Sequence, residues 1–338
     1  MRPIDPSNSQ PRFNDSTPAP DAGVAFPDIS GGDRTFSWLD QGFERFVQAF
    51  ALLASGLLFW MGWVIFQKAQ PAIQQFGFGF LVSQEWDVGK LTFGALPYLY
   101  GTIVSSLLAL LLALPIGVAV ALVTSENFLP PWMRSPIAFL VELIAAIPSV
   151  IIGLWGIFVL LPFLQPIQLW LFANFNSIPL FSTEPFGAGM LAAGVVLAIM
   201  ILPTIAALSR DVLLAVPADL RSASMALGAT RWETIFSVLL PSASSGILGA
   251  AILGLGRALG ETMAVTMVIG NSAQISPSLL NLASTIPAVL ANEFAEALEP
   301  LHIGALMYLS LILFAVTLAV NVGATLIVRA LGFERLRG

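Results

Sequence analysis

Long apolar runs, separated by shorter polar segments, dominate the pattern along the chain. A run of about 18 or more apolar residues is typical of a helix that crosses a membrane. Six such runs predict spanning helices at residues 46–67, 97–124, 135–163, 187–209, 241–269 and 303–330. Since about 20 residues suffice to cross a bilayer, the longer runs are expected to tilt, kink or extend beyond it. The pattern predicts an all-α integral membrane protein with six transmembrane helices.

The beginning of the chain follows a different pattern. Residues 1–40 are rich in Pro, Asp, Ser and Asn and lack apolar periodicity, which predicts a disordered tail. The first apolar run begins near Phe46 and is too long for a signal peptide, so we expect it to be retained as a helix. Residues 41–338 are then expected to form one transmembrane domain.

The composition excludes an ordinary soluble protein. Hydrophobic residues make up 57% of the 338 residues and charged residues only 10%, and the mean hydropathy is +0.86. Soluble domains carry roughly 25% charged residues. Cysteine is absent, which excludes a disulfide framework, a thiolate metal site and a cysteine nucleophile.

The single histidine, His302, lies just before the last apolar run. A metal site built on it would need further ligands at helical spacing, and none accompany it. We therefore predict an interfacial or loop residue, assign it no role and expect no metal site.

Basic residues are distributed unequally between the two sides that six spans create. If the N-terminus is cytoplasmic, Lys68 and Lys90 face outward and Arg257 lies within the membrane. All remaining basic residues then fall on the inner side: Arg2, Arg12, Arg34, Arg45, Arg134, Arg210, Arg221, Arg231, Arg329, Arg335 and Arg337. The positive-inside rule therefore predicts that both termini, and with them the tail, are cytoplasmic.

The outer connections are candidate interaction surfaces. Residues 164–186 carry several aromatic side chains and are expected to lie in the membrane interface. Residues 270–302 contain Glu293, Glu296 and Glu299 but neither lysine nor arginine. This acidic connection is interpreted either as a docking surface for an extracytoplasmic partner or as a solvated loop.

The cytosolic connection between the fourth and fifth spans carries the clearest local signals. Pro217 suits the first position of a helix, and Gly228 suits the residue just beyond its end. Between them, Leu220, Ala223 and Leu227 fall on one helical face. The pattern predicts a short amphipathic helix, which is either a simple connector or a docking element.

A second helix is predicted later in this connection, which spans residues 210–240. Thr230 is followed three residues later by Glu233, the spacing of a capping box. The helix that begins there leads toward the membrane, and Pro241 is expected to kink or restart it.

Two charged residues interrupt the fifth apolar run. An arginine near the middle of a bilayer costs about 2.5–3.5 kcal/mol, so Arg257 must face a partner, another subunit or a water-filled path. On a continuous helix, Glu261 lies about 40° around the axis from Arg257 and within pairing reach. The pair is interpreted either as a structural salt bridge or as the lining of a path for oxyanions, which a guanidinium binds through two parallel hydrogen bonds.

Small residues accompany these charges. Gly246, Ala250 and Gly254 recur at every fourth position, and Gly256 and Gly260 form a neighbouring stripe. Such spacing lets two membrane helices approach closely. One strip of the helix is therefore expected to pack against a neighbour while the next presents the charges.

A bend is predicted in the third span. Pro148 breaks the backbone hydrogen-bond ladder, and Ser149 and Gly153 follow it. This pattern is typical of a helix that bends beside a cavity, which makes Ser149 and Glu142 candidate pathway residues. The alternative is an ordinary proline kink with Glu142 at the cytosolic interface.

The cytosolic connection resembles the "EAA" loop of ATP-binding-cassette importer permeases. Gly228 and Leu240-Pro241 stand at the family's positions, whereas Ser222-Ala223-Ser224 replace its Glu-Ala-Ala. In that family the short helix sits in a groove of a cytosolic ATPase. The resemblance implies contact with an ATPase for Leu220, Arg221, Ser222, Ala223, Leu227, Gly228, Arg231 and Glu233.

Three motifs together resemble the PstC family, the permease subunits of phosphate-uptake ATP-binding-cassette importers. They are IPSVIIGLWG (147–156), VPADLRSASMALGATRWETI (216–235) and GLGRALGETMAVTMVIGN (254–271). The likeness runs from about Phe76 through the sixth span. It implies a type I importer permease fold in the bacterial inner membrane.

The resemblance also implies partners and a pathway. The partners would be a homologous permease, PstA, two copies of an ATPase, PstB, and an extracytoplasmic phosphate-binding protein, PstS. The sequence lacks a G-x-x-x-x-G-K-[ST] motif, so ATP and magnesium would be bound by the ATPase and this chain would need no cofactor. Arg257, Glu261 and Thr262 are implied to contribute to phosphate passage.

Other functions remain open from the residues alone. The anion could be sulfate, molybdate or a phosphonate instead of phosphate. A carrier that works alone and is driven by ions or protons could use Arg257 and Glu261 as its relay. An intramembrane enzyme ranks last, because we find no nucleophile and base set and assign no catalytic residue.

Overall fold

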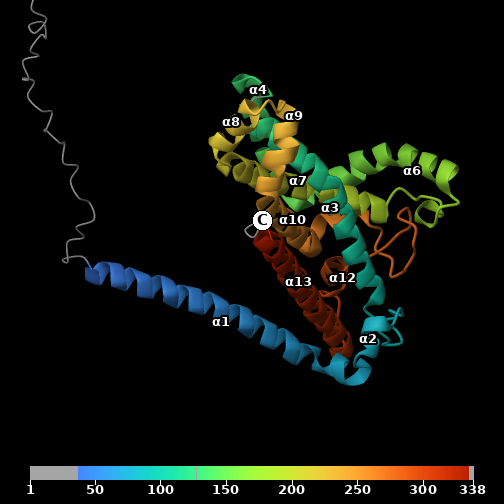
Figure 1. The fold of residues 1–338 in the computed structure, drawn as a ribbon. Helices are drawn as coiled ribbons and strands as arrows, with labels where there is room; N and C mark the ends of the chain where they lie inside the picture. Colours follow the sequence, from blue (N-terminus) through green and yellow to red (C-terminus); the bar gives the residue numbers. More distant parts are fainter. Residues whose placement is uncertain (1–36, 127, 335–338) are drawn as a thin grey trace, which may run out of the picture. The chain divides into compact units, whose positions relative to one another are not determined.

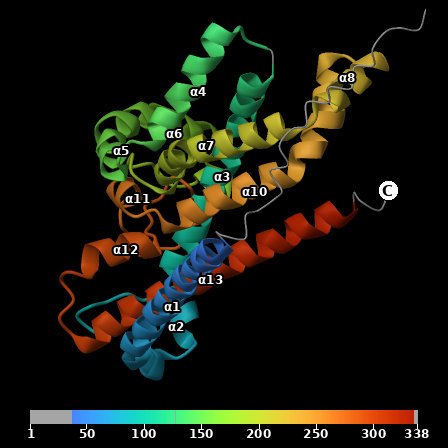
Figure 2. The same cartoon turned by 90° about the vertical axis from the view of Figure 1, so that its left-hand side faces the viewer.

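The computed structural model describes residues 37–126 and 128–334, and all regular elements in these residues are helices. The chain divides into a first unit, Met1–Phe59, and a second unit, Trp60–Gly338. Figures 1 and 2 show the helices of the second unit from two sides. The prediction of an all-α protein is confirmed.

The described part of the first unit is the beginning of helix α1 (Ser37–Phe76). Phe46, Phe50 and Phe59 are exposed on this stretch, as expected of side chains that face lipid. Residues 37–40 are helical, although they were predicted as the end of the disordered tail. The rest of the predicted tail lies outside the described residues.

The second unit holds the end of α1 and all later helices. In chain order these are α2 (Gly79–Val82), α3 (Leu96–Ser125), α4 (Pro131–Ala145), α5 (Ser149–Trp155), the π-helix η1 (Gly156–Leu160), α6 (Leu161–Phe175), the 3₁₀-helix η2 (Pro179–Phe181), α7 (Met190–Ala215), α8 (Ala218–Ala226), α9 (Arg231–Thr234), the π-helix η3 (Ile235–Leu239), α10 (Leu240–Gly260), α11 (Met263–Val268), α12 (Ile286–Glu293) and α13 (Pro300–Glu334).

Six helical stretches of the described chain are long and apolar enough to cross a membrane, as predicted. They are Gly42–Phe76, Leu96–Ser125, Ser149–Phe175, Met190–Ala215, Arg231–Gly260 and Pro300–Leu326.

The third span is shifted along the chain relative to the prediction. The predicted span 135–163 is interrupted just before Ser149, and the observed span is Ser149–Phe175. Pro148 takes an extended backbone conformation (φ −57°, ψ 137°) and cannot donate a helical hydrogen bond, so the helix restarts after it. Helix α6 therefore occupies much of the predicted outer connection at 164–186.

The fifth span begins and ends earlier than predicted, at Arg231–Gly260 instead of 241–269. Pro241 does not restart the helix, since α9, the π-helix η3 and α10 follow one another without a break. The wider π turn leaves room for a proline ring that would clash in an α-helix, and η1 precedes Pro162 in the same way. The span ends where Glu261 takes an extended conformation (φ −68°, ψ 128°).

Helix α7 lies at the centre of the second unit. Its most apolar window is 61% buried, against 33% or less for the other five spans. Helices α3 and α10 pack against it through glycines: a Cβ on Gly117 or Gly254 would lie 2.9 or 3.0 Å from Ile205. The predicted stripe of Gly246, Ala250 and Gly254 is thus confirmed as a packing surface, and it faces α7.

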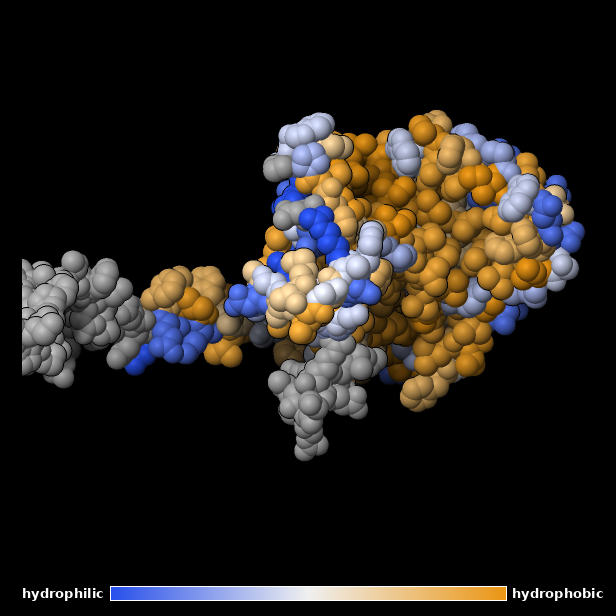
Figure 3. Space-filling view, turned by 45° about the horizontal axis from the view of Figure 1, so that its top comes forward, coloured by the Kyte–Doolittle hydropathy of each residue, from blue (hydrophilic) through white to orange (hydrophobic). Residues whose placement is uncertain are grey.

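The ends of the second unit differ in character. Helices α4, α8 and α9 gather at one end, and α2 lies at the opposite end (Figures 1 and 2). Figure 3 shows apolar side chains over most of the face that it presents, with hydrophilic residues toward its margins. This is the distribution expected of a protein that spans a membrane.

A polar cluster is buried near the beginning of α13. His302 is 5% exposed, and its Nε2 lies 2.9 Å from Oε2 of Glu293. The same oxygen accepts a hydrogen bond from Trp86 Nε1 at 2.9 Å, and the ring of Phe93 stacks on His302. His302 is therefore a buried helix residue that joins α12, α13 and the connection before α3, and the loop alternative of the prediction is wrong.

Glu293→Ala is expected to lower the free energy of unfolding by about 1–3 kcal/mol, because Trp86 and buried His302 lose their shared acceptor. The measurement is the thermal unfolding midpoint of the purified chain in detergent. Glu296→Ala removes an exposed carboxylate just beyond α12 and should leave that midpoint unchanged. Equal midpoints for both variants would contradict a stabilising role for the cluster.

Candidate functional site

Arg257 lines a groove of about 840 Å³ whose walls come from α7, α10 and α13. Its side chain is exposed, and Nη1 donates a long hydrogen bond of 3.4 Å to Oγ1 of Thr204 on α7. Leu253 and Ile252 supply apolar surface to the same groove. The guanidinium is thus held at one edge by a weak contact and otherwise presents its donors to an open space.

The opposite wall of the groove is a polar stripe on α13. Thr317, Asn321 and Thr325 line it, and their spacing of four residues places them on one helical face. A Cβ on Gly256 would lie 3.5 Å from Oδ1 of Asn321, so the amide covers the position where α10 lacks a side chain. Our sequence prediction missed this stripe, although the regular polar positions within the last apolar run signal it.

Arg257 and Glu261 do not share a continuous helix, which overturns the predicted geometry. Helix α10 ends at Gly260, and Oε1 of Glu261 accepts a hydrogen bond of 3.4 Å from the Ala264 amide in α11. Within residues 37–126 and 128–334, no carboxylate lies within ion-pair distance of Arg257. The break has a local cause, because glycine is a poor helix former and the Thr262 hydroxyl bonds the Gly260 carbonyl.

The interruptions of the third and fifth spans lie side by side. A Cβ on Gly153 of α5 would lie 3.1 Å from Cα of Ala264 in α11, and one on Gly156 would lie 2.9 Å from Val268. The residue numbers rise together along the contact, so α5 and α11 run in the same direction. Their starts, which carry Ser149 and Thr262, consequently lie at the same end of the pair.

The predicted pathway residues do not converge on one cavity. Thr262 lines a separate pocket of about 420 Å³ with Ser310 of α13. Glu142 is exposed near the end of α4, where it lines a third groove of about 350 Å³ with Arg134 and Arg210. Glu142 therefore lies beside two arginines and apart from the groove of Arg257.

Helix α8 forms as predicted and leaves its apolar face uncovered. Pro217 precedes the helix as its N-cap instead of being its first residue. Gly228 follows the helix with φ 90°, a conformation that favours glycine, and its amide donates to the Met225 carbonyl at 3.0 Å. Leu220 and Leu227 are exposed, the latter by 90%, together with Ala223.

The capping box of α9 is confirmed. Oγ1 of Thr230 accepts from the Glu233 amide, and the Glu233 carboxylate accepts from the Thr230 amide at 2.7 Å. The Ser224 and Thr234 hydroxyls lie 3.0 Å apart and join α8 to α9. Ser224, one of the two departures from the family pattern, thus links the two helices of the hairpin that α8 and α9 form.

The other departure and a neighbouring arginine stay at the surface. Ser222 donates to the Ala218 carbonyl at 3.2 Å within α8, and both Ser222 and Arg231 are exposed. They therefore lie where another polypeptide could reach them.

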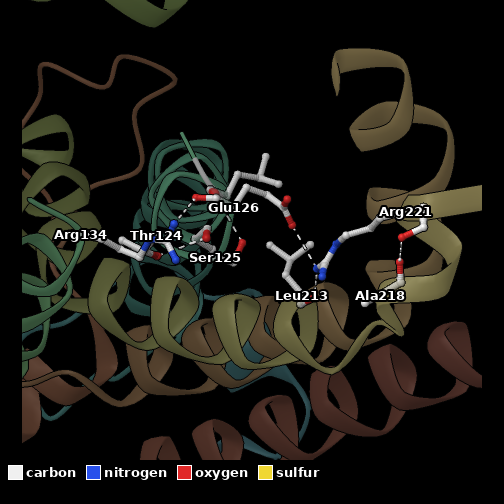
Figure 4. A network of polar contacts seen from close by, with 10 residues as sticks. Thr124, Ser125, Glu126, Arg134, Leu213, Ala218 and Arg221 are labelled. Carbon is white, nitrogen blue, oxygen red and sulfur yellow. Dashed lines mark hydrogen bonds and ion pairs between the residues drawn. The ribbon is translucent and has the colours of Figure 1, made fainter. Parts of the chain in front are cut away.

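Arg221 differs from the other predicted docking residues, because its side chain points back toward the membrane helices. Its Nη2 lies 3.0 Å from Oε1 of Glu126 and donates to the Leu213 carbonyl at 2.9 Å (Figure 4). Both side chains are largely buried, with 23% and 19% exposed. Glu126 was not predicted, since nothing near it in the sequence identifies a partner so distant along the chain.

Comparison with known sequences identifies relatives over most of the chain. The family described as binding-protein-dependent transport system inner membrane component matches residues 113–332. The phosphate transport system permease protein PstC of Mesorhizobium japonicum is 44% identical over 84% of this chain and 88% of its own length. The protein of the same name from Haemophilus influenzae is 40% identical over 86% and 94%.

A solved structure has the same fold. It is a chain of a bacterial alginate ABC transporter in complex with an alginate pentasaccharide-bound periplasmic protein. The TM-score is 0.57 at 16% identity, and the match covers 86% of this chain and 96% of the other. The predicted fold of a type I ABC importer permease is confirmed. The chain therefore belongs to the family of binding-protein-dependent transport system inner membrane components, and within it to the permeases named PstC.

Proposed function

We propose that this chain forms half of the path by which inorganic phosphate enters the cell through an ATP-driven importer of the inner membrane. Membership of the family implies a separate ATPase and a substrate-binding protein. The observation that carries the proposal is Arg257, an exposed guanidinium in a large groove of a membrane span, with no carboxylate paired to it in the described residues. Relatives named as phosphate permeases support it.

The chemistry of the groove suits an oxyanion. Guanidinium presents a rigid fork of donors that matches two oxygens of phosphate, and it remains charged at any physiological pH. Thr204 and Asn321 add a hydroxyl and an amide to the walls. Since an arginine in lipid is unfavourable by about 2.5–3.5 kcal/mol, the exposed side chain of Arg257 needs water, an anion or a second permease beside it.

The alternatives use the same residues differently. Sulfate, molybdate or a phosphonate would fit the same fork, so the anion is decided by competition experiments. A carrier that works alone has less support, because Glu261 bonds to α11 instead of forming a relay with Arg257. We propose no catalytic role for this chain.

We further propose the arrangement of the partners. Arg134, Arg210, Arg221 and Arg231 belong to the end that carries α4, α8 and α9, and the positive-inside rule then makes this end cytoplasmic, together with both termini. A PstB-type ATPase pair, which binds ATP and magnesium, would dock there. A PstA-type permease would complete the path, and a PstS-type phosphate-binding protein would dock at the opposite end.

Leu227→Asp is expected to reduce copurification of the ATPase with the tagged chain by about tenfold or more. The side chain is 90% exposed, so the substitution spares the core but places a charge on the apolar face of α8. Leu298→Asp is the matched control, because Leu298 is 88% exposed before α13 and should leave copurification unchanged. Normal recovery of the ATPase with Leu227→Asp would contradict docking through α8.

Arg257→Lys is expected to lower phosphate uptake by about tenfold in vesicles that contain the complete transporter. Lysine keeps the charge but loses the fork, and a hydrogen bond to a charged group contributes about 1.5–3 kcal/mol. Labelled phosphate uptake is measured together with recovery of the assembled complex. Arg45→Lys, an exposed conservative change in α1, should leave both unchanged.

Two outcomes would contradict the proposal, one in this experiment and one in a competition assay with unlabelled anions. Loss of assembly in Arg257→Lys would indicate a structural role for the arginine. Displacement of labelled phosphate by sulfate or molybdate at equal concentration would favour a different oxyanion as the cargo.

A further inference from the structure

Four segments of the chain meet at the ion pair between Glu126 and Arg221 (Figure 4). Glu126 follows the last residue of α3, and Arg221 lies in α8. Leu213, near the end of α7, supplies a carbonyl to Arg221, and Arg134 of α4 donates to the Glu126 carbonyl at 3.1 Å. The pair therefore connects three membrane-associated helices to α8.

The backbone holds Glu126 in place at this junction. Its amide donates to the Leu122 carbonyl at 2.9 Å and so caps α3, while its own backbone is extended (φ −91°, ψ 158°). The hydrogen bond from Arg134 fixes its carbonyl. The carboxylate is thus attached firmly to the end of α3, and a force on it acts on that helix.

The contact between the two charges allows some movement. Nη2 of Arg221 lies 3.0 Å from Oε1 of Glu126 and donates to the Leu213 carbonyl, but Oε1 of Glu126 accepts no hydrogen bond from the described residues, so the attraction between the two is mainly electrostatic. A cavity of about 150 Å³, lined also by Met225 and Ile235, adjoins the pair. An ion pair beside a cavity tolerates a change of angle that interlocked apolar side chains resist.

Helix α8 reaches three spans by three different routes. The chain itself joins it to α7 through the short turn at Val216 and Pro217. The Ser224 and Thr234 hydroxyls join it to the hairpin that continues into α10. The ion pair of Glu126 and Arg221 joins it to the residue that follows α3.

We propose that Glu126 and Arg221 form a transmission joint, which conveys the displacement of α8 by the ATPase to α3. This rests on the proposed docking of the ATPase at α8. Both residues are positioning residues, since neither has to touch the anion or ATP. Helix α3 also packs along α7, so the pair adds a direct link from α8 to the end of α3. Without the joint, α8 still binds the ATPase and still moves α7 and α10, but the end of α3 follows α8 less closely, so hydrolysis is partly uncoupled from transport.

The test uses the complete transporter in liposomes and measures phosphate uptake and ATP hydrolysis in the same vesicles. Glu126→Gln is expected to lower the phosphate taken up per ATP hydrolysed by about fivefold, while the amount of copurified ATPase stays normal. Arg221→Glu should lower this ratio as well. The exchanged pair E126R/R221E should recover most of it, because opposite charges then face each other again. Asp211→Asn, which removes an exposed charge near the end of α7, should not change it.

The outcomes separate this proposal from the proposed function. A normal ratio in Glu126→Gln, or no recovery in the exchanged pair, would overturn the joint. Loss of the ATPase from the Glu126→Gln complex would also overturn it, because the pair would then serve docking. If Leu227→Asp retains the ATPase, the docking proposal fails whatever the ratio in Glu126→Gln.

Discussion

Backbone polar groups in an apolar environment must find partners within the protein, since each unpaired group costs several kcal/mol. This constraint accounts for the form of the spans. Pro162 and Pro241 would interrupt α-helices, yet the π turns of η1 and η3 precede them and the helices continue. The chain does break before Ser149 and after Gly260. There, Glu261 accepts a hydrogen bond from the Ala264 amide, and the short helices α5 and α11 pack against each other.

The same constraint gives the charged side chains of the chain two different environments. Arg257 lies in a groove with polar side chains from α7 and α13, where water or an anion can reach it. Arg221 and Glu126 are largely buried and form an ion pair, and Arg221 also donates to a carbonyl near the end of α7. Between Arg231 and Arg257 the fifth span runs without a break, which at 1.5 Å per residue is on the order of 40 Å. One rigid helix thus links the α8 hairpin to the groove.

Particular residues show why some elements could be predicted from the sequence and others could not. Thr230 and Glu233 cap α9 through contacts within four residues, so their spacing sufficed. Pro148 and Pro241 carry similar local signals, yet the helix breaks at the first and continues through the second. A π turn precedes Pro241, and Pro115 and Pro203 lie inside α-helices as well, so a proline alone does not decide where a helix of this chain breaks. The polar stripe of α13 was readable from its spacing but was missed.

The sequence by itself determined what depends on composition and near neighbours along the chain: six apolar spans, the amphipathic α8 and the cap of α9. Only the tertiary structure decided the partners of the ionisable side chains, namely Glu126 for Arg221, Glu293 for His302 and Thr204 for Arg257. The physical reason is how far apart along the chain the interacting residues lie. Apolar transfer energy and helix periodicity are summed over adjacent residues, whereas an ion pair or hydrogen bond requires two atoms within about 3 Å, and distant helices bring them together.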